Sequence, residues 1–353
     1  MVKKLRFWLN FGIGLAIAAF FLWLFFRSVK NWGELWDSLL TARYIFIVPA
    51  ILISLATFIF RALRWHYLLY GIKRIPSLRL FSPMLIGFMG NCLLPARAGE
   101  FIRAYLLAQR ENIKLTASLA TLVVDRMFDM FVLLLLIAGV LLFYPLDETV
   151  LLSATGRSLE DIRFFLGVVA TSAFAGLVGF ILLLYYKKDA AARILSAVLF
   201  FLPSGVRQKI VALFVSFTEG LHIFKNGRHV CIAVVISIAQ WILGALMFYP
   251  LFFAFGIQEK LSLTSVAVVL AAASVGVSIP TPGYAGPFHF FVQVGLQLCD
   301  SSISDTTAKA YALVTHIATF FPVILIGIGF AFKEGISLAQ MEKTSEQLKE
   351  SVE

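Results

Sequence analysis

The chain contains few charged residues. Asp, Glu, Lys and Arg make up 14% of its 353 residues, whereas soluble domains carry about 25%. Hydrophobic residues make up 60%, and Phe alone occurs 35 times. This composition excludes an ordinary soluble domain and indicates an integral membrane protein.

Cysteine and histidine are also scarce. The three cysteines, Cys92, Cys231 and Cys299, are scattered in or beside apolar segments and form neither a disulfide framework nor a metal-ligand spacing. The five histidines show no HExxH pattern, so we expect no metal site and no cofactor. We recognise no nucleotide-binding loop, no nucleophile–base pattern and no soluble catalytic segment. The sequence therefore predicts that this polypeptide is not an enzyme.

Six apolar stretches are each long enough to cross a bilayer as a helix, which takes about 18 residues. They lie near 5–26, 44–66, 117–143, 164–186, 230–256 and 308–332. The first follows a basic N-terminus, but its apolar part is too long for a signal peptide, so we predict a retained span. The expected fold class is an all-α polytopic membrane protein.

Two further apolar stretches, 80–108 and 262–299, are interrupted by Pro and Gly. A straight helix through either one would lose backbone hydrogen bonds where no water can replace them. We therefore predict two broken or re-entrant helical hairpins, in which Pro and Gly permit sharp turns and close packing. The residues expected at the breaks are Pro95 and Gly99 in the first hairpin and Pro280, Pro282, Gly283 and Gly286 in the second.

Loop charges predict the orientation of the chain. Residues 61–79 contain five Lys and Arg residues and no Asp or Glu, whereas 144–163 is mainly acidic. By the positive-inside rule the first loop is cytoplasmic and the second is not. Six spans and two re-entrant hairpins then place both termini in the cytoplasm. We interpret the net charge of +10 as contact with lipid headgroups and expect no nucleic acid as a partner.

A single transmembrane domain is expected over residues 1–332. Within it, 187–229 combines helical apolar spacing with basic residues, which is typical of amphipathic helices on the inner leaflet. Residues 333–353 form a polar tail, to which we assign no function.

The two broken stretches resemble each other. "LLPARAGEF" at 93–101 and "SIPTPGYAGPF" at 278–288 both place Pro after an apolar approach and then an Ala-Gly pair. They lie within halves of about 44–143 and 230–332, each between two predicted spans. The predicted topology orients them oppositely, which is the pattern of inverted repeats whose broken helices meet near the bilayer midplane and form a substrate site.

Charged residues follow the first break. Arg97, Glu100 and Arg103 recur every three residues, close to a helix N-terminus that favours anions. One interpretation is a phosphate-headgroup site in which the arginines donate hydrogen bonds and Glu100 orients them. The alternative is that these side chains extend to the cytoplasmic interface and anchor the hairpin.

Three more charges, Asp125, Arg126 and Asp129, fall inside the predicted span 117–143. A charge at the membrane centre costs about 2.5–3.5 kcal/mol, so such residues normally face partners or water. Asp125 and Asp129 share a helix face, and Arg126 can reach Asp129 at i,i+3. They form either a polar cavity wall, with a carboxylate that takes up protons, or a structural ion-pair lock to Arg97 or Arg103.

Other polar residues allow two interpretations each. Arg61 and Arg64 end the span at 44–66, where we expect an interfacial belt, with headgroup contact as the alternative. His289 is either a hydrogen-bonded structural residue or a contact for protons or substrate. The same alternatives apply to His316 in the last span. The other polar residues near the second break are Tyr284 and Gln293.

The chain resembles the lysylphosphatidylglycerol synthase transmembrane-region family, also called the flippase-like domain family. The matching motifs are "FRALRW" at 60–65, "NCLLPARAGEFIRAYLL" at 91–107, "DRMFD" at 125–129 and "SIPTPGYAG" at 278–286. The resemblance implies an integral inner-membrane protein linked to the movement of lipids or lipid-linked molecules between leaflets. Two residues depart from the family pattern, since Tyr284 replaces a Gly and His289 stands where a Glu is usual. Fused members carry a soluble synthase or transferase domain, which this chain lacks.

Three kinds of function fit these features. The leading one is a flippase-like transporter that moves an anionic phospholipid or a lipid-linked intermediate across the inner membrane. The alternatives are a membrane-embedded lipid-modifying enzyme and a non-transporting scaffold that binds lipid for a partner enzyme. Membrane lipids are the expected partners, with a homo-oligomer left open. The candidate substrate-binding residues are Arg97, Glu100, Arg103, Asp125, Arg126, Asp129, Arg61, Arg64, Tyr284 and His289.

Overall fold

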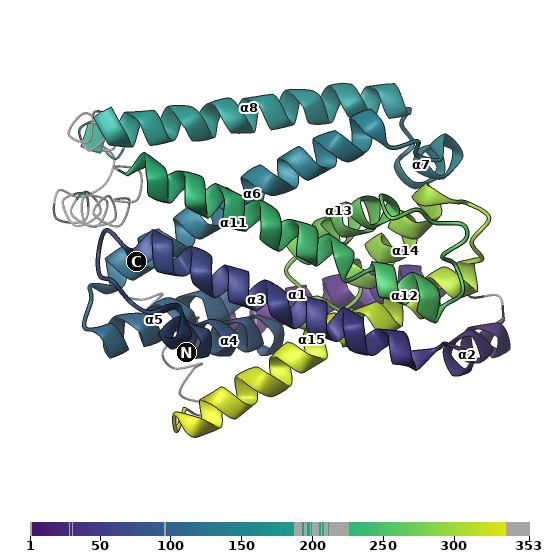
Figure 1. The fold of residues 1–353 in the computed structure, drawn as a ribbon, viewed down its shortest axis with the longest axis horizontal. Coiled ribbons are helices and arrows are strands. Elements are labelled where there is room, and N and C mark those ends of the chain that lie inside the picture. Colours follow the sequence, from purple (N-terminus) through teal and green to yellow (C-terminus); the bar gives the residue numbers. More distant parts are fainter. Residues whose placement is uncertain are drawn as a thin grey trace.

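Helices make up all of the regular structure in the part of the chain that is described. The computed structural model describes residues 2–27, 29, 31–94, 97–186 and 226–336, with isolated positions between 193 and 211. Within these ranges every regular element is a helix, which confirms the all-α fold class (Figure 1). Pro95, most of 187–229 and residues 337–353 lie outside the described residues, so the predictions made for them are not tested.

Each of the six predicted spans coincides with a helix. These helices are α1 (Val2–Arg27), α3 (Ile47–Leu69), α6 (Leu115–Phe143), α8 (Leu159–Tyr186), α11 (Gly227–Leu246) with α12 (Tyr249–Ala254), and α15 (Asp305–Lys333). Four segments of the described chain are long and apolar enough to cross a membrane: Tyr44–Leu69, Leu115–Phe143, Gly227–Ala254 and Asp305–Lys333. The first of them includes the short helix η1 (Tyr44–Phe46). The described residues therefore contain four candidate spans by length and composition, and the six spans that the sequence predicted are not confirmed.

A fifth span arises only if two bent helices are counted together. The part of α1 from Gly12 to Arg27 is bent by 96° relative to α2 (Trp32–Leu40). Helix α2 was not predicted from the sequence. Its N-cap, Asn31, accepts hydrogen bonds from the backbone N–H groups of Gly33 and Glu34, which explains why a new helix begins there.

The first interrupted stretch forms two helices, α4 (Ser77–Leu93) and α5 (Ala98–Glu111), that pack against each other. Glycine allows this close approach. A Cβ atom at Gly99 would lie 1.8 Å from the carbonyl oxygen of Gly87, and one at Gly90 would lie 3.0 Å from the Cα atom of Gly99. Small residues at such contacts let helix backbones approach closely in a membrane.

The second interrupted stretch forms α13 (Ser265–Ser278), the short helix η5 (Pro282–Tyr284) and α14 (Pro287–Cys299). Here too glycines line the contact between the two long helices. A Cβ atom at Gly276 would lie 2.8 Å from the carbonyl oxygen of Pro287, and one at Gly295 would lie 2.8 Å from the Cβ atom of Ala272. The chain thus breaks both apolar stretches where the prolines and glycines predicted it.

The two breaks meet inside the molecule. A Cβ atom at Gly283 would lie 3.9 Å from the carbonyl oxygen of Cys92, near the end of α4. Helix α1 passes alongside the second break, where a Cβ atom at Gly286 would lie 2.6 Å from the carbonyl oxygen of Ala18. Gly286 has φ 88°, a conformation that a residue with a side chain rarely adopts. These contacts bring the end of α4, the short helix η5 and α1 together.

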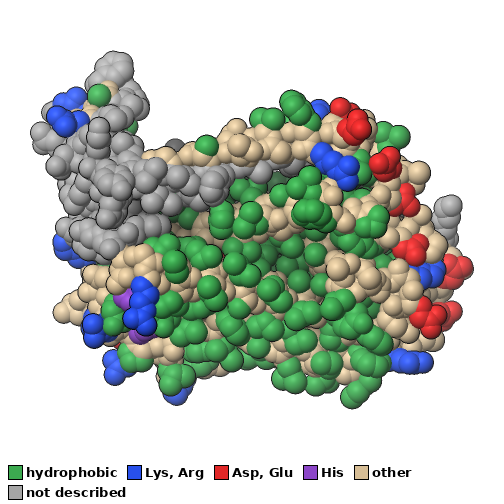
Figure 2. Space-filling view, turned by 45° about the horizontal axis from the view of Figure 1, so that its top comes forward, with side chains coloured by type: hydrophobic (Ala, Val, Ile, Leu, Met, Phe, Trp, Pro, Cys, Tyr) green, Lys and Arg blue, Asp and Glu red, His purple; other side chains and the backbone are tan. Residues whose placement is uncertain are grey.

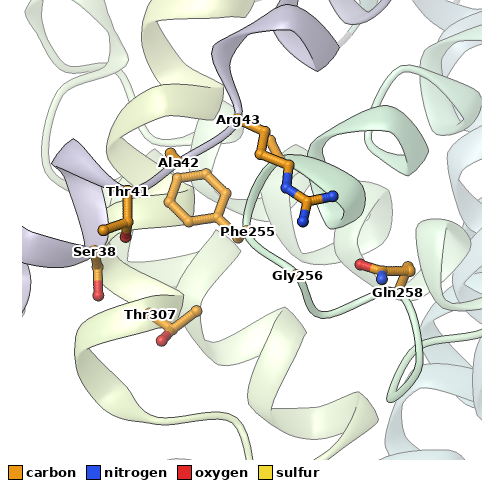
Figure 3. A pocket seen from close by; sticks show the side chains of 9 residues that line it. Ser38, Thr41, Ala42, Arg43, Phe255, Gly256, Gln258 and Thr307 are labelled. Carbon is orange, nitrogen blue, oxygen red and sulfur yellow. The ribbon is translucent and has the colours of Figure 1, made fainter.

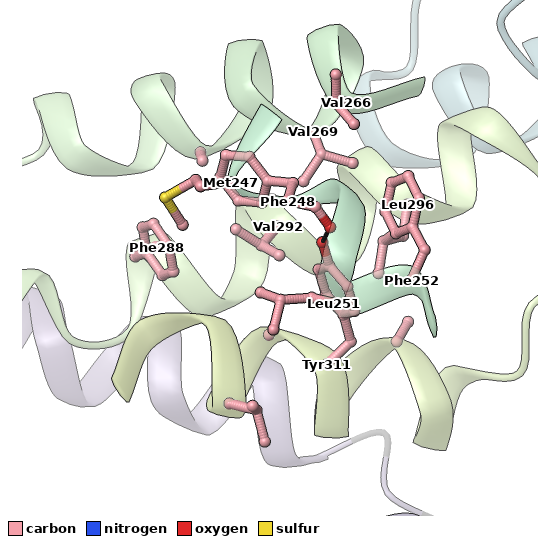
Figure 4. Packing of buried hydrophobic residues seen from close by; sticks show 14 of the residues in the cluster. Met247, Phe248, Leu251, Phe252, Val266, Val269, Phe288, Val292, Leu296 and Tyr311 are labelled. Carbon is pink, nitrogen blue, oxygen red and sulfur yellow. Dashed lines mark hydrogen bonds between the residues drawn. The ribbon is translucent and has the colours of Figure 1, made fainter. Parts of the chain in front are cut away.

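An apolar core surrounds the second hairpin. Side chains from α12, α13, α14 and α15 interdigitate there, and Leu251, Val292 and Leu296 are fully buried (Figure 4). The hydroxyl group of Tyr311 donates a hydrogen bond to the carbonyl oxygen of Phe248 over 3.0 Å, so the polar end of this buried ring is satisfied.

The two ends of the molecule differ in charge. Helices α2, α12 and α7 (Glu148–Thr155) lie at one end of the long axis, which we call the α7 end (Figure 1). Figure 2 shows acidic side chains gathered at this end and hydrophobic side chains covering the middle of the same face. The opposite end, which we call the α5 end, carries Lys73, Arg74 and Arg79 in the turn before α4 and at its start. An apolar band between polar ends is the surface expected of a membrane protein.

Candidate functional site

Arg64 is at the centre of a buried network of charges. It lies on α3, and its side chain is fully enclosed. Its Nε atom donates to Oδ1 of Asp125 over 2.8 Å, and its Nη1 atom donates to Oδ1 of Asp129 over 2.8 Å. Nη1 also donates to the hydroxyl oxygen of Ser237 on α11 over 3.0 Å. One guanidinium group therefore joins three helices.

Asp125 and Asp129 lie one turn apart on α6, as the sequence predicted for a shared face. Asp125 also faces Arg103, with 3.4 Å between its Oδ2 atom and Nη1 of the arginine. Asp129 accepts hydrogen bonds from two α11 side chains, from Nε1 of Trp241 over 3.3 Å and from Nε2 of Gln240 over 3.5 Å. The two carboxylates thus have partners on α3, α5 and α11.

Two further arginines complete the network. Arg126 is 3.4 Å from Asp129, at the predicted i,i+3 spacing, and 3.5 Å from Asp125. Arg61 is 3.5 Å from Asp129. Glu100 is 3.6 Å from Arg126. We call the resulting set the arginine cluster: Arg61, Arg64, Arg103 and Arg126 with Glu100, Asp125 and Asp129.

Aromatic rings support the arginines of the cluster. The guanidinium carbon of Arg103 lies 3.9 Å from the ring centroid of Trp65, and that of Arg61 lies 5.1 Å from the centroid of Phe88. Trp65 is itself held by a hydrogen bond of 3.0 Å from its Nε1 atom to the hydroxyl oxygen of Thr121. Cation–π contacts of this kind strengthen where water is excluded.

One part of the arginine cluster is buried, and the other part, its open side, is partly exposed. The side chains of Arg64 and Asp125 are at most 2% exposed. Those of Arg61, Glu100 and Arg126 are 22%, 28% and 33% exposed. Since Asp125 follows Leu115 by 10 residues of α6, it lies about 15 Å along the helix from the α5 end. The cluster therefore lies within the apolar band and is reached through its partly exposed members.

Several N–H groups of the cluster lack a partner within the described part of the chain. The Nε and Nη2 atoms of Arg103 are buried and have neither a hydrogen bond nor an ion pair there, since its contact with Asp125 is made by Nη1. Leaving such a group unsatisfied costs about 1–3 kcal/mol and more when the group is charged. These donors are available to an anion that enters from the open side.

Arg97 links the cluster to the second hairpin. It is the N-cap residue of α5 and has φ 52°, an uncommon conformation for a residue other than glycine. Its Nη2 atom donates to the carbonyl oxygen of Val277 over 2.6 Å, whereas its buried Nε atom has no described partner. The alternative interpretation, in which Arg97 extends to the cytoplasmic interface as an anchor, is not supported, because its side chain points to the other broken helix.

Two other expectations need correction. Arg64 was expected in an interfacial belt at the end of its span, but it is fully buried because two aspartates and Ser237 surround it. Glu100 was expected to orient Arg97 and Arg103. Its ion pair within the described residues is instead with Arg126 on the neighbouring helix, at 3.6 Å. By contrast, the ion-pair lock between α6 and Arg103 is confirmed, with Arg64 as its main partner.

A glycine positions Arg103. A Cβ atom at Gly87 would lie 2.7 Å from the Cβ atom of Arg103, so only glycine at position 87 leaves room for this arginine to pack against α4. The close packing of the first hairpin and the placement of a charged side chain in the cluster thus depend on the same residue.

Of the polar residues near the second break, Tyr284 lies close enough to Arg97, Glu100 and Arg126 to interact with them electrostatically, whereas the two histidines hydrogen-bond to the backbone of the break itself. Nδ1 of His289 accepts a hydrogen bond of 3.2 Å from the backbone N–H of Gly286, which caps α14. Nε2 of His316 lies 2.8 Å from the carbonyl oxygen of Gly283, and the two imidazole rings are 4.5 Å apart. The Tyr284 ring packs on Phe320. The structure therefore supports the structural interpretation of both histidines.

Helix α11 contributes polar side chains to the site that were not predicted from the sequence. Ser237, Gln240 and Trp241 all face Asp129 or Arg64, and Ser237 and Gln240 are buried. Their spacing of i, i+3 and i+4 places them on one helix face. Polar residues at this spacing inside an apolar segment are the signal that could have identified them.

A separate polar cavity opens at the α7 end. It has a volume of about 300 Å³ and is lined by Ser38, Thr41, Ala42, Arg43, Ala254, Phe255, Gly256, Gln258 and Thr307. Figure 3 shows the side chains of Arg43 and Gln258 on one side of it and those of Ser38 and Thr307 across from them. The buried Oε1 atom of Gln258 has no hydrogen-bond partner in the described structure. The cavity therefore offers a cation and an unused acceptor.

The sequence of the chain is similar to those of known proteins. A family model described as "Lysylphosphatidylglycerol synthase TM region" matches residues 12–327. Two relatives are proteins of Methanothermobacter thermautotrophicus, each named "UPF0104 membrane protein". One is 24% identical over 88% of this chain and 92% of its own length, and the other is 26% identical over 80% of each chain. A third relative is "Glycosyltransferase AglD" of Haloferax volcanii, 24% identical over 77% of this chain but only 46% of its own length.

Proposed function

Since the chain belongs to the lysylphosphatidylglycerol synthase transmembrane-region family, we propose that it moves an anionic phospholipid or a lipid-linked intermediate between the two leaflets of a membrane. The observation that carries the proposal is the arginine cluster, with buried N–H groups that lack a described partner and a partly exposed side. Buried charges inside a membrane protein mark ligand or ion pathways by default.

The arrangement of the two hairpins supports movement of the headgroup. The breaks meet through Arg97 and Val277, and each hairpin is held together by glycine contacts within itself. We propose that the two halves, 44–143 and 230–332, are inverted repeats and that their hairpins part and close around the headgroup. Transporters with broken helices use such rigid halves for alternating access.

In this proposal the cavity at the α7 end is a second binding site for the headgroup. A headgroup that leaves the arginine cluster passes the junction of the hairpins and reaches Arg43, which offers a cation at the far end. The Oε1 atom of Gln258 accepts a hydroxyl or amine of the same headgroup. Two cationic sites on opposite sides of a junction fit a path across the membrane.

The charge asymmetry supports an orientation. Basic residues precede α4 at the α5 end, and acidic residues gather at the α7 end (Figure 2). We propose that the α5 end and both termini are cytoplasmic and that the membrane is the inner membrane, in line with the positive-inside rule.

Reconstitution of the full chain into liposomes tests the proposal. Fluorescent phosphatidylglycerol, a labelled anionic phospholipid, should exchange between leaflets faster than in protein-free vesicles. Arg126→Gln, which removes a partly exposed donor of the cluster, should slow exchange about tenfold, the effect of losing about 1.4 kcal/mol. Arg79→Gln removes a more exposed arginine outside the cluster and should leave the rate unchanged. Exchange no faster than in empty vesicles, for this lipid and other anionic phospholipids, would refute transport.

A second candidate function is lipid presentation to a partner enzyme. The observation in its favour is that this chain matches less than half the length of a relative named as a glycosyltransferase. In that case the liposomes would retain labelled lipid on the protein without exchange. A partner enzyme co-purified with the chain would lose activity when the chain is removed.

A further inference from the structure

The charge of the arginine cluster indicates what kind of headgroup it holds. Its members are connected by ion pairs of 2.7–3.6 Å, and they comprise four arginines and three carboxylates. Four positive and three negative charges leave a net charge of +1. An uncompensated charge within the apolar band is unfavourable, so the cluster favours an anion that neutralises it.

Arg97 adds a second positive charge beside the cluster. Its guanidinium group meets the C-terminal turn of α13, where helix carbonyl groups carry a partial negative charge. The N-terminus of α5, which begins one residue later, carries a partial positive charge of similar size. The two helix ends offset each other, and the net charge of the site is therefore +2.

The unsatisfied donors point to the same ligand. Two arginines have buried N–H groups without a described hydrogen bond or ion pair: Arg97 at Nε, and Arg103 at Nε and Nη2. A phosphate monoester has three terminal oxygen atoms and close to two negative charges at neutral pH. A phosphodiester has only two such oxygen atoms and one negative charge, so it would leave both a donor and a charge uncompensated.

We infer that the arginine cluster together with Arg97 binds a lipid-borne phosphate monoester in preference to a phosphodiester headgroup. The inference rests on the proposed function, because it names the substrate class of the same site. The lipid enters from the side on which Arg61, Glu100 and Arg126 are exposed. The rings of Trp65 and Phe88 hold the faces of two arginines and leave their edges free for the phosphate.

Binding of defined lipids to the purified full chain tests the inference. The probes are phosphatidic acid as the monoester, phosphatidylglycerol as the diester, and inorganic phosphate as the soluble source. Phosphatidic acid should bind about tenfold more tightly than phosphatidylglycerol at pH 8. The ratio should fall towards one at pH 5, because the monoester loses its second charge with a pKa of about 6. Equal affinities at pH 8 would overturn the inference, and tighter binding of inorganic phosphate would overturn the assignment to a lipid.

Two variants change the net charge in opposite directions without breaking the buried ion pairs of Arg64 with Asp125 and Asp129. Arg97→Gln lowers it to +1 and should abolish the preference for phosphatidic acid. Glu100→Gln raises it to +3 and should keep or increase the preference. If Arg97→Gln does not fold, Glu100→Gln still tests the inference. A loss of the preference for phosphatidic acid in Glu100→Gln would contradict the charge argument. Arg79→Gln serves as the control and should keep the preference.

The two proposals fail differently. Preferential binding of phosphatidic acid without exchange between leaflets would refute transport and leave the assignment of the headgroup standing. Exchange of phosphatidylglycerol by a protein that does not prefer the monoester would refute the assignment of the headgroup and leave transport standing.

Discussion

The Nη2 atom of Arg97 donates a hydrogen bond to the carbonyl oxygen of Val277 over 2.6 Å. Arg97 begins α5 after the break of the first hairpin, and Val277 lies in the last turn of α13 before the break of the second. This contact joins two segments 180 residues apart in the chain. Since α5 also carries Glu100 and Arg103, the contact joins the second hairpin to the helix that supplies two members of the arginine cluster.

Loss of Arg64 should destabilise the fold strongly. Arg64→Met leaves Asp125 and Asp129 buried without their shared partner, and removing one member of a buried pair costs about 3–5 kcal/mol. Thermal unfolding in detergent should show a large fall in melting temperature. The matched variant Arg79→Met removes an arginine that is 70% exposed and should change stability by less than about 1 kcal/mol. A variant at position 64 that melts with the wild type would contradict the structural role.

Close packing of the first hairpin should not tolerate a methyl group at Gly99. In Gly99→Ala the new Cβ atom would lie 1.8 Å from the carbonyl oxygen of Gly87, so α4 and α5 must separate. Gly139→Ala on α6 is the control, because nothing lies within 4 Å of a Cβ atom there. Alanine favours a helix over glycine by about 1 kcal/mol, so the control should melt at the same or a higher temperature. If both variants behaved alike, the close contact would be refuted.

Removal of the cation at the α7 end should slow transport without unfolding the protein. Arg43 lines the polar cavity and has an exposed side chain, so Arg43→Gln should cut lipid exchange by about tenfold, as expected for a lost charged hydrogen bond. Arg43→Lys keeps the charge and should retain more of the rate. Lys260→Gln removes a charge at the same end that is bound to Ser302, and it should have no effect. An unchanged rate in Arg43→Gln would remove the cavity from the proposed path.

Cysteine labelling should reveal the orientation. In a Cys231→Ser background, which removes the exposed native cysteine, Glu148→Cys should react with a membrane-impermeant maleimide in intact cells. Arg74→Cys, in the turn before α4, should react only after permeabilisation. The opposite pattern would place the α7 end in the cytoplasm and reverse the proposed topology.

Much of the architecture was predictable because apolar length and backbone chemistry are local properties. The positions of all six apolar helices and of both breaks follow from hydrophobic runs and from Pro and Gly, which act on their own segment of chain. The bend of 96° between α1 and α2 was not predictable in this way. It depends on the Asn31 cap and on packing of α2 against α15, a contact distant in sequence.

The candidate site was predictable in its members but not in its pairings. Asp125 and Asp129 were recognisable because charges in an apolar helix need partners. Their main partner, Arg64, was expected at an interface, since it lies near the end of its helix. Only the packing of α3 between α6 and α11 encloses it. The helical spacing of Arg97, Glu100 and Arg103 likewise predicted pairing within α5, whereas the structure pairs Glu100 and Arg103 with α6.

The sequence by itself determined that the chain is an all-α membrane protein with two broken apolar stretches and charges that a bilayer does not tolerate alone. These properties follow from the cost of exposing backbone and charged groups to lipid, which each segment incurs wherever it lies. The tertiary structure alone decided that the breaks meet, that Arg64 joins both aspartates, and that Arg97 extends to Val277. The hydrogen bonds of these two arginines join residues 61 to 180 positions apart, and only packing brings them together.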